Sequence, residues 1–277
     1  MLKDMSNPSF LEITTIAHEL LDYERISLRL RKNGSCRSLN ELLRQVAFDI
    51  QDSKDETFDE LRQEHALDTL RRIRTTLQDL GYGQVTGRKD YLTPLDTALR
   101  DKELDSFNTT IIYFSVAQIS GIPITVHLNG SDIFLRYDCP AEFYWNPRNQ
   151  SSALDKLDVT DLEQISIELT TEHIIAMHHV VKAHYFQSKD DHESAIQYAN
   201  SAINEFPGYW LAHKIKGISL EQTGELRTAI QSYADARFLN LSDDDTLRLL
   251  EAAVQKREKK EFDIFSAIMS AGIRKRI

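Results

Sequence analysis

The pattern of apolar and polar residues predicts helices over most of the first 80 residues. Apolar side chains recur at helical spacing through residues 11–30, and a polar break follows. Ser38 is a suitable N-cap for a second apolar run over 39–50. A third helix is expected over 57–80, where Gly81 follows the run in the position of a C-cap. The chain is therefore expected to begin with a helical segment.

The pattern changes between residues 84 and 150, where helices precede a set of strands. A short helix is predicted over 94–102, and a more apolar helix over 108–120 is expected to end at Gly121. Residues 122–128 (IPITVHL) alternate in polarity and are rich in β-branched side chains, which predicts a strand.

The strongest turn signal in the chain follows that strand. Asn129 and Gly130 form the dipeptide most typical of a two-residue β-hairpin. The partner strand is predicted over 132–137, and a third short strand over 142–145. A helix packed beside an antiparallel meander is an α+β architecture.

From Val159 onward the chain is predicted to be helical again, with an internal repeat. Small residues recur 34 positions apart in three pairs, Ala183 and Gly217, Ala195 and Ala229, and Ala202 and Ala236. This period is typical of tetratricopeptide repeats, in which helices cross closely only at small side chains. Pro207 lies where the first repeat should end. Two final helices, over 246–260 and 262–271, are expected to cap the stack.

Composition and charge narrow the function classes. The 277 residues are 41% hydrophobic and 27% charged, which is ordinary for a globular protein. With 33 basic and 43 acidic residues the net charge is −10, which repels a nucleic-acid backbone. Two cysteines, Cys36 and Cys139, cannot build a disulfide framework, so we expect a reducing compartment, the cytoplasm. No apolar run approaches the roughly 20 residues of a membrane span, and no signal-peptide core is present.

Several short motifs occur in an order that is similar to a known family. They are LRRIRTTLQDLGYGQVTGRKDYLTPLDTALRDKEL, the helix end FSVAQISGIPI, the hairpin end FLRY and the segment WNPRN, followed by the repeats. Over roughly residues 60–245 the chain resembles the bacterial SirB-type transglutaminase-like proteins. The resemblance implies a transglutaminase-like core followed by tetratricopeptide repeats.

The chain departs from the pattern of this family at the three catalytic positions. Active members of the wider superfamily use a Cys at the start of the core helix, a His on the next strand and an Asp on the following one, as nucleophile, base and orienting group. The matching positions here are Ser106, Asp132 and Asn146. We therefore expect a pseudo-enzyme. The alternative is a divergent cysteine or serine amide hydrolase or acyltransferase that uses Cys139 or Ser106.

Other candidate chemistry in the chain is weaker. Cys139 and His127 fall in the same predicted meander, but Cys139 does not lie at a helix N-terminus that would lower its pKa. Four histidines of one helical segment lack the spacing of a metal site, and no phosphate-binding glycine loop occurs. These histidines are His173, His178, His179 and His184. No metal and no cofactor is expected.

The sequence thus predicts a mostly helical α+β protein in two parts. Residues 1–158 would hold the helical segment and the transglutaminase-like core, and residues 159–277 the repeat module. The predicted function is a non-catalytic, regulatory or scaffolding interaction with a protein or peptide in the groove of the repeats, without nucleic acid or membrane, and with the oligomeric state left open. The candidate contact residues, expected to be exposed on the inner helices, are His179, Lys182, Tyr209, His213 and Lys216.

Overall fold

In the computed structural model the described residues are 15–27, 39–46, 62–84, 93–129, 132–137, 143–146 and 166–274. They divide into two compact units, residues 1–171 and 172–277. The fold is α+β and mostly helical, as the sequence predicts, with a small antiparallel sheet. The predicted domain boundary after residue 158 lies outside the described residues.

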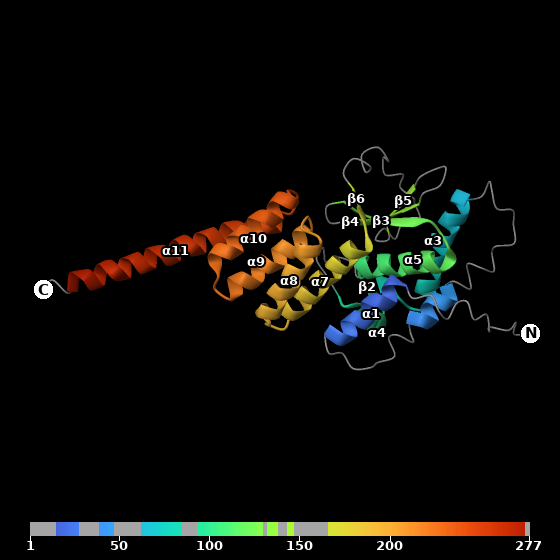
Figure 1. Ribbon diagram of the computed structural model, residues 1–277, viewed down its shortest axis with the longest axis horizontal. Helices are drawn as coiled ribbons and strands as arrows, with labels where there is room; N and C mark the ends of the chain where they lie inside the picture. Colours follow the sequence, from blue (N-terminus) through green and yellow to red (C-terminus); the bar gives the residue numbers. More distant parts are fainter. Residues whose placement is uncertain are drawn as a thin grey trace, which may run out of the picture. The chain divides into compact units, whose positions relative to one another are not determined.

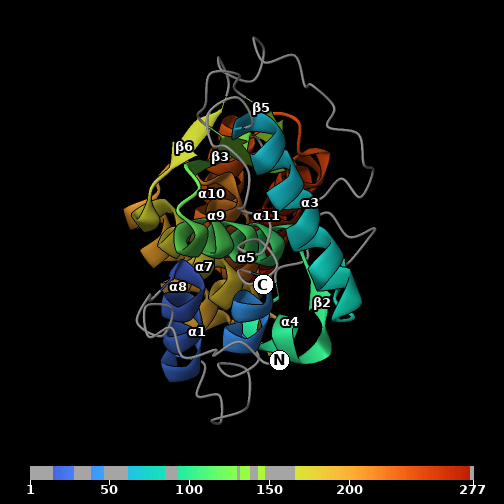
Figure 2. The ribbon, with the colours of Figure 1, turned by 90° about the vertical axis from the view of Figure 1, so that its right-hand side faces the viewer.

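The first unit is built around helix α5, Ser106–Ser120. Helices α1 (Ile16–Ser27) and α4 (Leu95–Asp101) lie on one side of α5, and the sheet lies on the other (Figures 1 and 2). Helix α3 (Arg62–Asp79) also contacts α5, and a further helix spans 39–46. Most α5 side chains are buried, because a helix that is apolar on nearly all sides forms the centre of a core.

Glycines end two of these helices where the sequence predicts. Gly81 has φ +82°, and the amide of Tyr82 donates to the carbonyl of Leu77 at 2.8 Å. Gly121 has φ +68°, and the amide of Ile122 donates to Ala117 at 3.0 Å. These left-handed conformations satisfy the last helical carbonyls and favour glycine over any side chain.

The start of α4 is capped from a distant part of the chain. Its own N-cap residue, Pro94, makes no side-chain hydrogen bond. The carboxylate of Glu24, fully buried in α1, instead accepts from the amide of Leu95 at 2.7 Å and from that of Asp96 at 2.9 Å. Two of the orphan amide donors at the start of α4 are thus satisfied by α1.

The main sheet has the strand order β5-β4-β3-β6 and is antiparallel throughout. The predicted hairpin is confirmed, but Asn129 is the last residue of its first strand, opposite Asp132, and not a turn residue. The prediction of helix from Val159 onward is wrong at β6, because residues 167–169 pair with the free edge of β3. The strands are β3 (Ile124–Asn129), β4 (Asp132–Tyr137), β5 (Phe143–Trp145) and β6 (Ile167–Leu169), and a separate parallel pair joins β1 (Gly83–Gln84) to β2 (Glu103–Leu104).

The second unit consists of helices joined by short turns, and Figure 1 shows them as successive antiparallel neighbours. Close packing joins α8 to α9, α9 to α10 and α10 to α11. The repeat period is visible in the structure, since α8 and α10 begin 34 residues apart. The helices are α7 (Thr171–Gln187), α8 (His192–Glu205), α9 (Trp210–Gln222), α10 (Leu226–Leu239) and α11 (Asp244–Arg274).

The last helix differs from the prediction of two separate helices. α11 runs without interruption through residue 261, where the sequence analysis placed a break. No glycine or proline stands there, and Glu261 is held within the helix by the guanidinium of Arg257, whose Nε donates at 2.9 Å. In Figure 1 the distal part of α11 extends beyond α10.

The small residues of the repeat lie where helices pack. Ala195, Ala202, Ala229 and Ala236 have no exposed surface. Gly217 is the tightest position, because a Cβ atom built on it would lie 2.6 Å from Cδ1 of the buried Tyr233. The 34-residue period thus marks positions at which a larger side chain has no room.

Replacing Ala202 with leucine is expected to lower the melting temperature, because overpacking a filled site costs about 1–3 kcal/mol. Leucine at the neighbouring Ser201, which is only partly buried, is expected to change it far less. Thermal denaturation followed by circular dichroism compares the two variants. Equal melting temperatures would show that the repeat register is wrong.

Candidate functional site

The start of α5 is the position at which the resemblance places a nucleophile. Ser106 begins the helix and is half-buried, and among the described residues its hydroxyl has no hydrogen bond. The preceding Asp105 is buried and accepts from the amides of Asn108 at 2.8 Å and Thr93 at 2.9 Å. Asp105 therefore caps the helix and anchors the preceding loop.

Burial raises the pKa of Asp105 to about 6 from 3.8, although three backbone amides oppose the shift. The folded state then holds this proton more tightly than the unfolded state, so the free energy of unfolding falls as the pH rises from about 4 to about 6. The contribution is about 3 kcal/mol at most, at 1.36 kcal/mol per pKa unit.

Replacing Asp105 with asparagine is expected to flatten the pH dependence of stability between pH 4 and 6. Urea denaturation across that range measures the slope, and the exposed Asp101→Asn variant is the matched control. An unchanged slope in the Asp105 variant would contradict the assignment.

Strand register separates Ser106 from the other two degenerate positions. Trp145 of β5 lies opposite Leu135 of β4 and stacks on Tyr113 of α5, with ring centroids 6.4 Å apart. Neighbouring residues of a strand point to opposite faces of the sheet. Leu135 and Trp145 are on the face toward α5, so the register assigns Asp132 and Asn146 to the other face. The structure does not bring the three positions together.

That second face carries a histidine that the structure places between two hydroxyls. The ring of His127 is buried, with Nε2 lying 3.0 Å from Oγ1 of Thr125 and Nδ1 lying 3.4 Å from Oγ of Ser166. Ser166 precedes β6, a strand too short for its pattern to predict, so no signal in the sequence links Ser166 to His127. Cys139, the predicted alternative partner, lies outside the described residues.

Three of the five predicted contact residues are buried, so the expectation of their exposure is wrong. His179 stacks on Tyr198 at 6.0 Å and lies 3.4 Å from Glu205, and the ammonium of Lys182 lies 5.1 Å from the centre of the Tyr198 ring. Tyr209 stacks on a phenylalanine ring of the turn after α8. These side chains are turned inward because they pack against α8 and its C-terminal turn.

Burial also determines the protonation of the histidines in α7. It lowers the pKa of His178 and that of His179, and the charge of Lys182 lowers both further, while Glu205 opposes the shift at His179. Both rings are therefore neutral at pH 7. They act as packing groups in the second unit.

The remaining two candidates keep part of their surface. His213 is half-buried, with Nε2 lying 3.1 Å from the carbonyl oxygen of Pro207 and Nδ1 lying 3.9 Å from Asp235. Lys216 is half-buried and forms no ion pair with any described residue.

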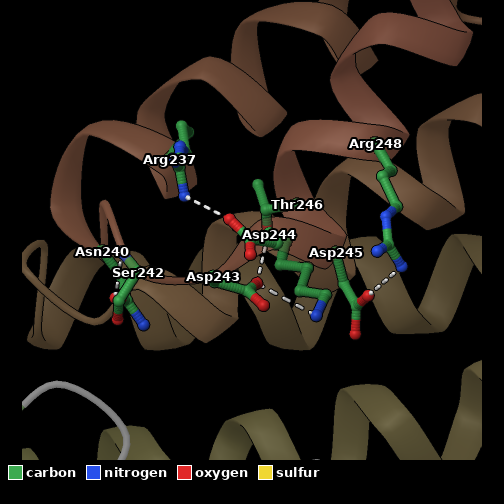
Figure 3. A network of polar contacts seen from close by, with 9 residues as sticks. Arg237, Asn240, Ser242, Asp243, Asp244, Asp245, Thr246 and Arg248 are labelled. Carbon is green, nitrogen blue, oxygen red and sulfur yellow. Dashed lines mark hydrogen bonds and ion pairs between the residues drawn. The ribbon is translucent and has the colours of Figure 1, made fainter.

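Three consecutive acidic residues lie where the chain enters α11, and each has a basic partner (Figure 3). Asp243 lies 3.1 Å from the ammonium of Lys214 and accepts from the hydroxyl of Thr246. The partners of Asp244 and Asp245 are Arg237, at 3.9 Å, and Arg248, at 3.4 Å. The cluster therefore joins α9, α10 and α11.

The second unit also exposes large apolar side chains. Phe238, Leu239 and Leu241, which we call the turn patch, lie at the end of α10 and in the turn to α11, and Phe238 is 81% exposed. Farther along α11, Phe262 is 69% exposed and Ile264 52%. Exposed apolar patches on a protein surface often mark interaction sites.

The described residues contain neither a metal-binding cluster nor a membrane-spanning helix. No group of three or more His, Cys, Asp or Glu side chains there could hold a metal ion. None of the described helices is long and apolar enough to cross a membrane. Comparison of the chain with protein-family models, with curated proteins and with solved structures gives no match.

Proposed function

We propose that the protein is a non-catalytic interaction protein, whose second unit binds a protein partner. The observation that carries this proposal is the turn patch together with Phe262 and Ile264, since large apolar side chains are exposed at two places along the last two helices of the second unit. Burial of such side chains supplies most of the free energy of protein association. The cysteine content favours the cytoplasm as the place of this interaction.

The helical architecture supports the same proposal. Successive antiparallel helices with a 34-residue period and small residues at the crossings are what tetratricopeptide repeats would provide. Stacks of this kind present extended surfaces to a partner chain.

The first unit is proposed to keep a transglutaminase-like fold without its chemistry, as in the SirB-type proteins that the chain resembles. The Ser106 hydroxyl is hydrogen-bonded to no described base, and strand register assigns Asp132 and Asn146 to the sheet face away from α5. A nucleophile needs a base within hydrogen-bonding reach.

One observation favours a hydrolase as a second candidate, namely the 3.4 Å approach of Ser166 to His127. A fluorophosphonate probe distinguishes the two functions, because it labels serines that a base activates. The interaction function predicts no labelling of Ser166. Labelling that Ser166→Ala or His127→Gln abolishes would favour the hydrolase.

The interaction function is tested by capture from an extract of the source cells, followed by quantitative mass spectrometry. The turn patch is altered by Phe238→Ser with Leu241→Ser, and the control carries Lys189→Ser with Arg248→Ser at exposed polar positions. We expect at least one protein to be enriched tenfold or more on the wild type and the control and lost on the patch variant. Equal capture by all three would contradict the proposal.

A further inference from the structure

The face of α11 that packs against α10 continues beyond the end of the α9–α10 pair. Thr246 and Ala253 are fully buried, and Leu249 and Leu250 pack against the cluster that contains Tyr233. The same helical spacing leads on through residues 256, 260 and 264. The turn between α9 and α10 ends at Glu225. Beyond this turn, neither α9 nor α10 covers the distal part of this face of α11.

A cavity of about 550 Å³ lies where the covering ends. Leu226 and Ile264 provide its apolar walls, and α11 contributes Lys256 and, one turn later, Lys259 and Lys260. Gly224, which has φ +87° and no atom near the position of a Cβ, leaves the wall formed by the α9–α10 turn open. This volume is in the range of ligand sites, about 300–1,000 Å³.

The charges of the cavity are only partly compensated within the protein. Lys256 pairs with Glu221 at 3.0 Å, and Glu221 also accepts from the hydroxyl of Tyr233 at 3.1 Å. Lys259 and Lys260 form no ion pair with any described residue, and neither does Asp263. The cavity therefore keeps a positive excess in a protein whose net charge is −10.

We propose that this cavity binds an amphipathic helix of the partner protein, with acidic residues beside its apolar face. The proposal rests on the interaction function and assigns it a site. Apolar residues of the partner helix would contact Leu226 and Ile264, and its carboxylates would meet Lys259 and Lys260. The lining residues of α11 span 256–264, roughly 12 Å of helix axis, which is about two turns of the partner.

The test uses a fluorescein-labelled, helix-forming peptide of 14 residues with leucine on one face and glutamate on the other. Fluorescence anisotropy with the whole 277-residue chain is expected to give a micromolar Kd. A peptide with lysine in place of every glutamate is expected to bind at least tenfold more weakly, as is one with serine in place of every leucine. Raising the salt concentration should weaken the binding of the acidic peptide.

The site is tested with two variants of equal charge change. Lys259→Glu with Lys260→Glu is expected to raise the Kd at least tenfold, while Lys189→Glu with Arg248→Glu, at exposed positions away from the cavity, leaves it within twofold. Ile264→Ser tests the apolar wall and should also raise the Kd. Circular dichroism of each variant confirms that the fold is retained.

Several results would overturn the site. They are no binding of the acidic peptide, equal binding of the acidic and basic peptides, or equal losses in the two charge variants. Sedimentation could instead show a dimer that Ile264→Ser dissociates and that the peptide leaves intact. That result would mean that a second copy of the chain, and not a partner helix, occupies the cavity. If the turn-patch variant also fails to capture a partner from the cell extract, any of these results would contradict only the cavity as the binding site. The proposed interaction function would still be supported.

Discussion

Replacing Gly217 with alanine is expected to destabilise the second unit, although the same change at an open helix position stabilises a protein by about 1 kcal/mol. The added Cβ would lie 2.6 Å from Cδ1 and 2.7 Å from Cε1 of Tyr233. Tyr233 is fully buried, and its hydroxyl donates to Glu221, so its ring has little freedom to move away. Overpacking of this kind costs about 1–3 kcal/mol.

A double-mutant cycle separates this clash from other effects. Tyr233→Ala alone should cost about 3–5 kcal/mol, because it removes a large buried ring. The first repeat carries alanine at both equivalent positions, Ala183 and Ala199, and both are fully buried. The double variant should therefore lose less than the sum of the single losses, which urea denaturation measures. Additive losses, or a stabilising Gly217→Ala, would contradict the packing described.

Replacing Asp243 with alanine is expected to lower the free energy of unfolding by about 3 kcal/mol, because it leaves a buried ammonium without this carboxylate. The side chains of Lys214 and Asp243 are only 7% and 14% exposed and lie 3.1 Å apart. The change also removes the hydrogen bond from Thr246 in the first turn of α11. Urea denaturation at pH 7 measures the loss.

Two comparisons test the origin of that loss. Adding Lys214→Met to Asp243→Ala should restore part of the stability, because the ammonium is then absent. The exposed pair of Asp245 and Arg248 provides the control, since Asp245→Ala should cost less than about 1 kcal/mol. No recovery in the double variant would show that the buried ion pair is not the cause.

The same pair predicts the behaviour of the protein in acid. Burial raises the pKa of Asp243, but the hydrogen bond from Thr246 and the charge of Lys214 outweigh it and hold the pKa below 3.8. Its contribution to stability is therefore present above about pH 4 and is lost as the pH falls below that value.

Local signals in the sequence were enough to place many elements. Gly121 ends α5, and a hairpin at the predicted place joins β3 to β4, because short-range sterics and turn chemistry decide these features. β6 was missed because three residues carry too little periodicity, and the free edge of β3 stabilises that strand. The prediction divides α11 at the charged residues before Phe262, but neither a glycine nor a proline stands there to end a helix.

The side chains of the candidate sites were harder to predict. Lys182 and His179 are polar, and their positions in a repeat suggested exposure, but α8 covers them. The approach of Ser166 to His127 joins residues 39 positions apart and depends on the pairing of β6. Such contacts come from tertiary packing, which single-residue patterns do not contain.

The cap that Glu24 supplies to α4 has a consequence for the order of folding. A helix of seven residues is too short to persist alone, and its two amide donors find their acceptor 71 and 72 positions earlier in the chain. α4 can therefore become stable only after α1 has docked, and this long loop must close first. A truncation that removes α1 would leave residues 95–101 frayed, and a protease would cut there before it reached the core of α5.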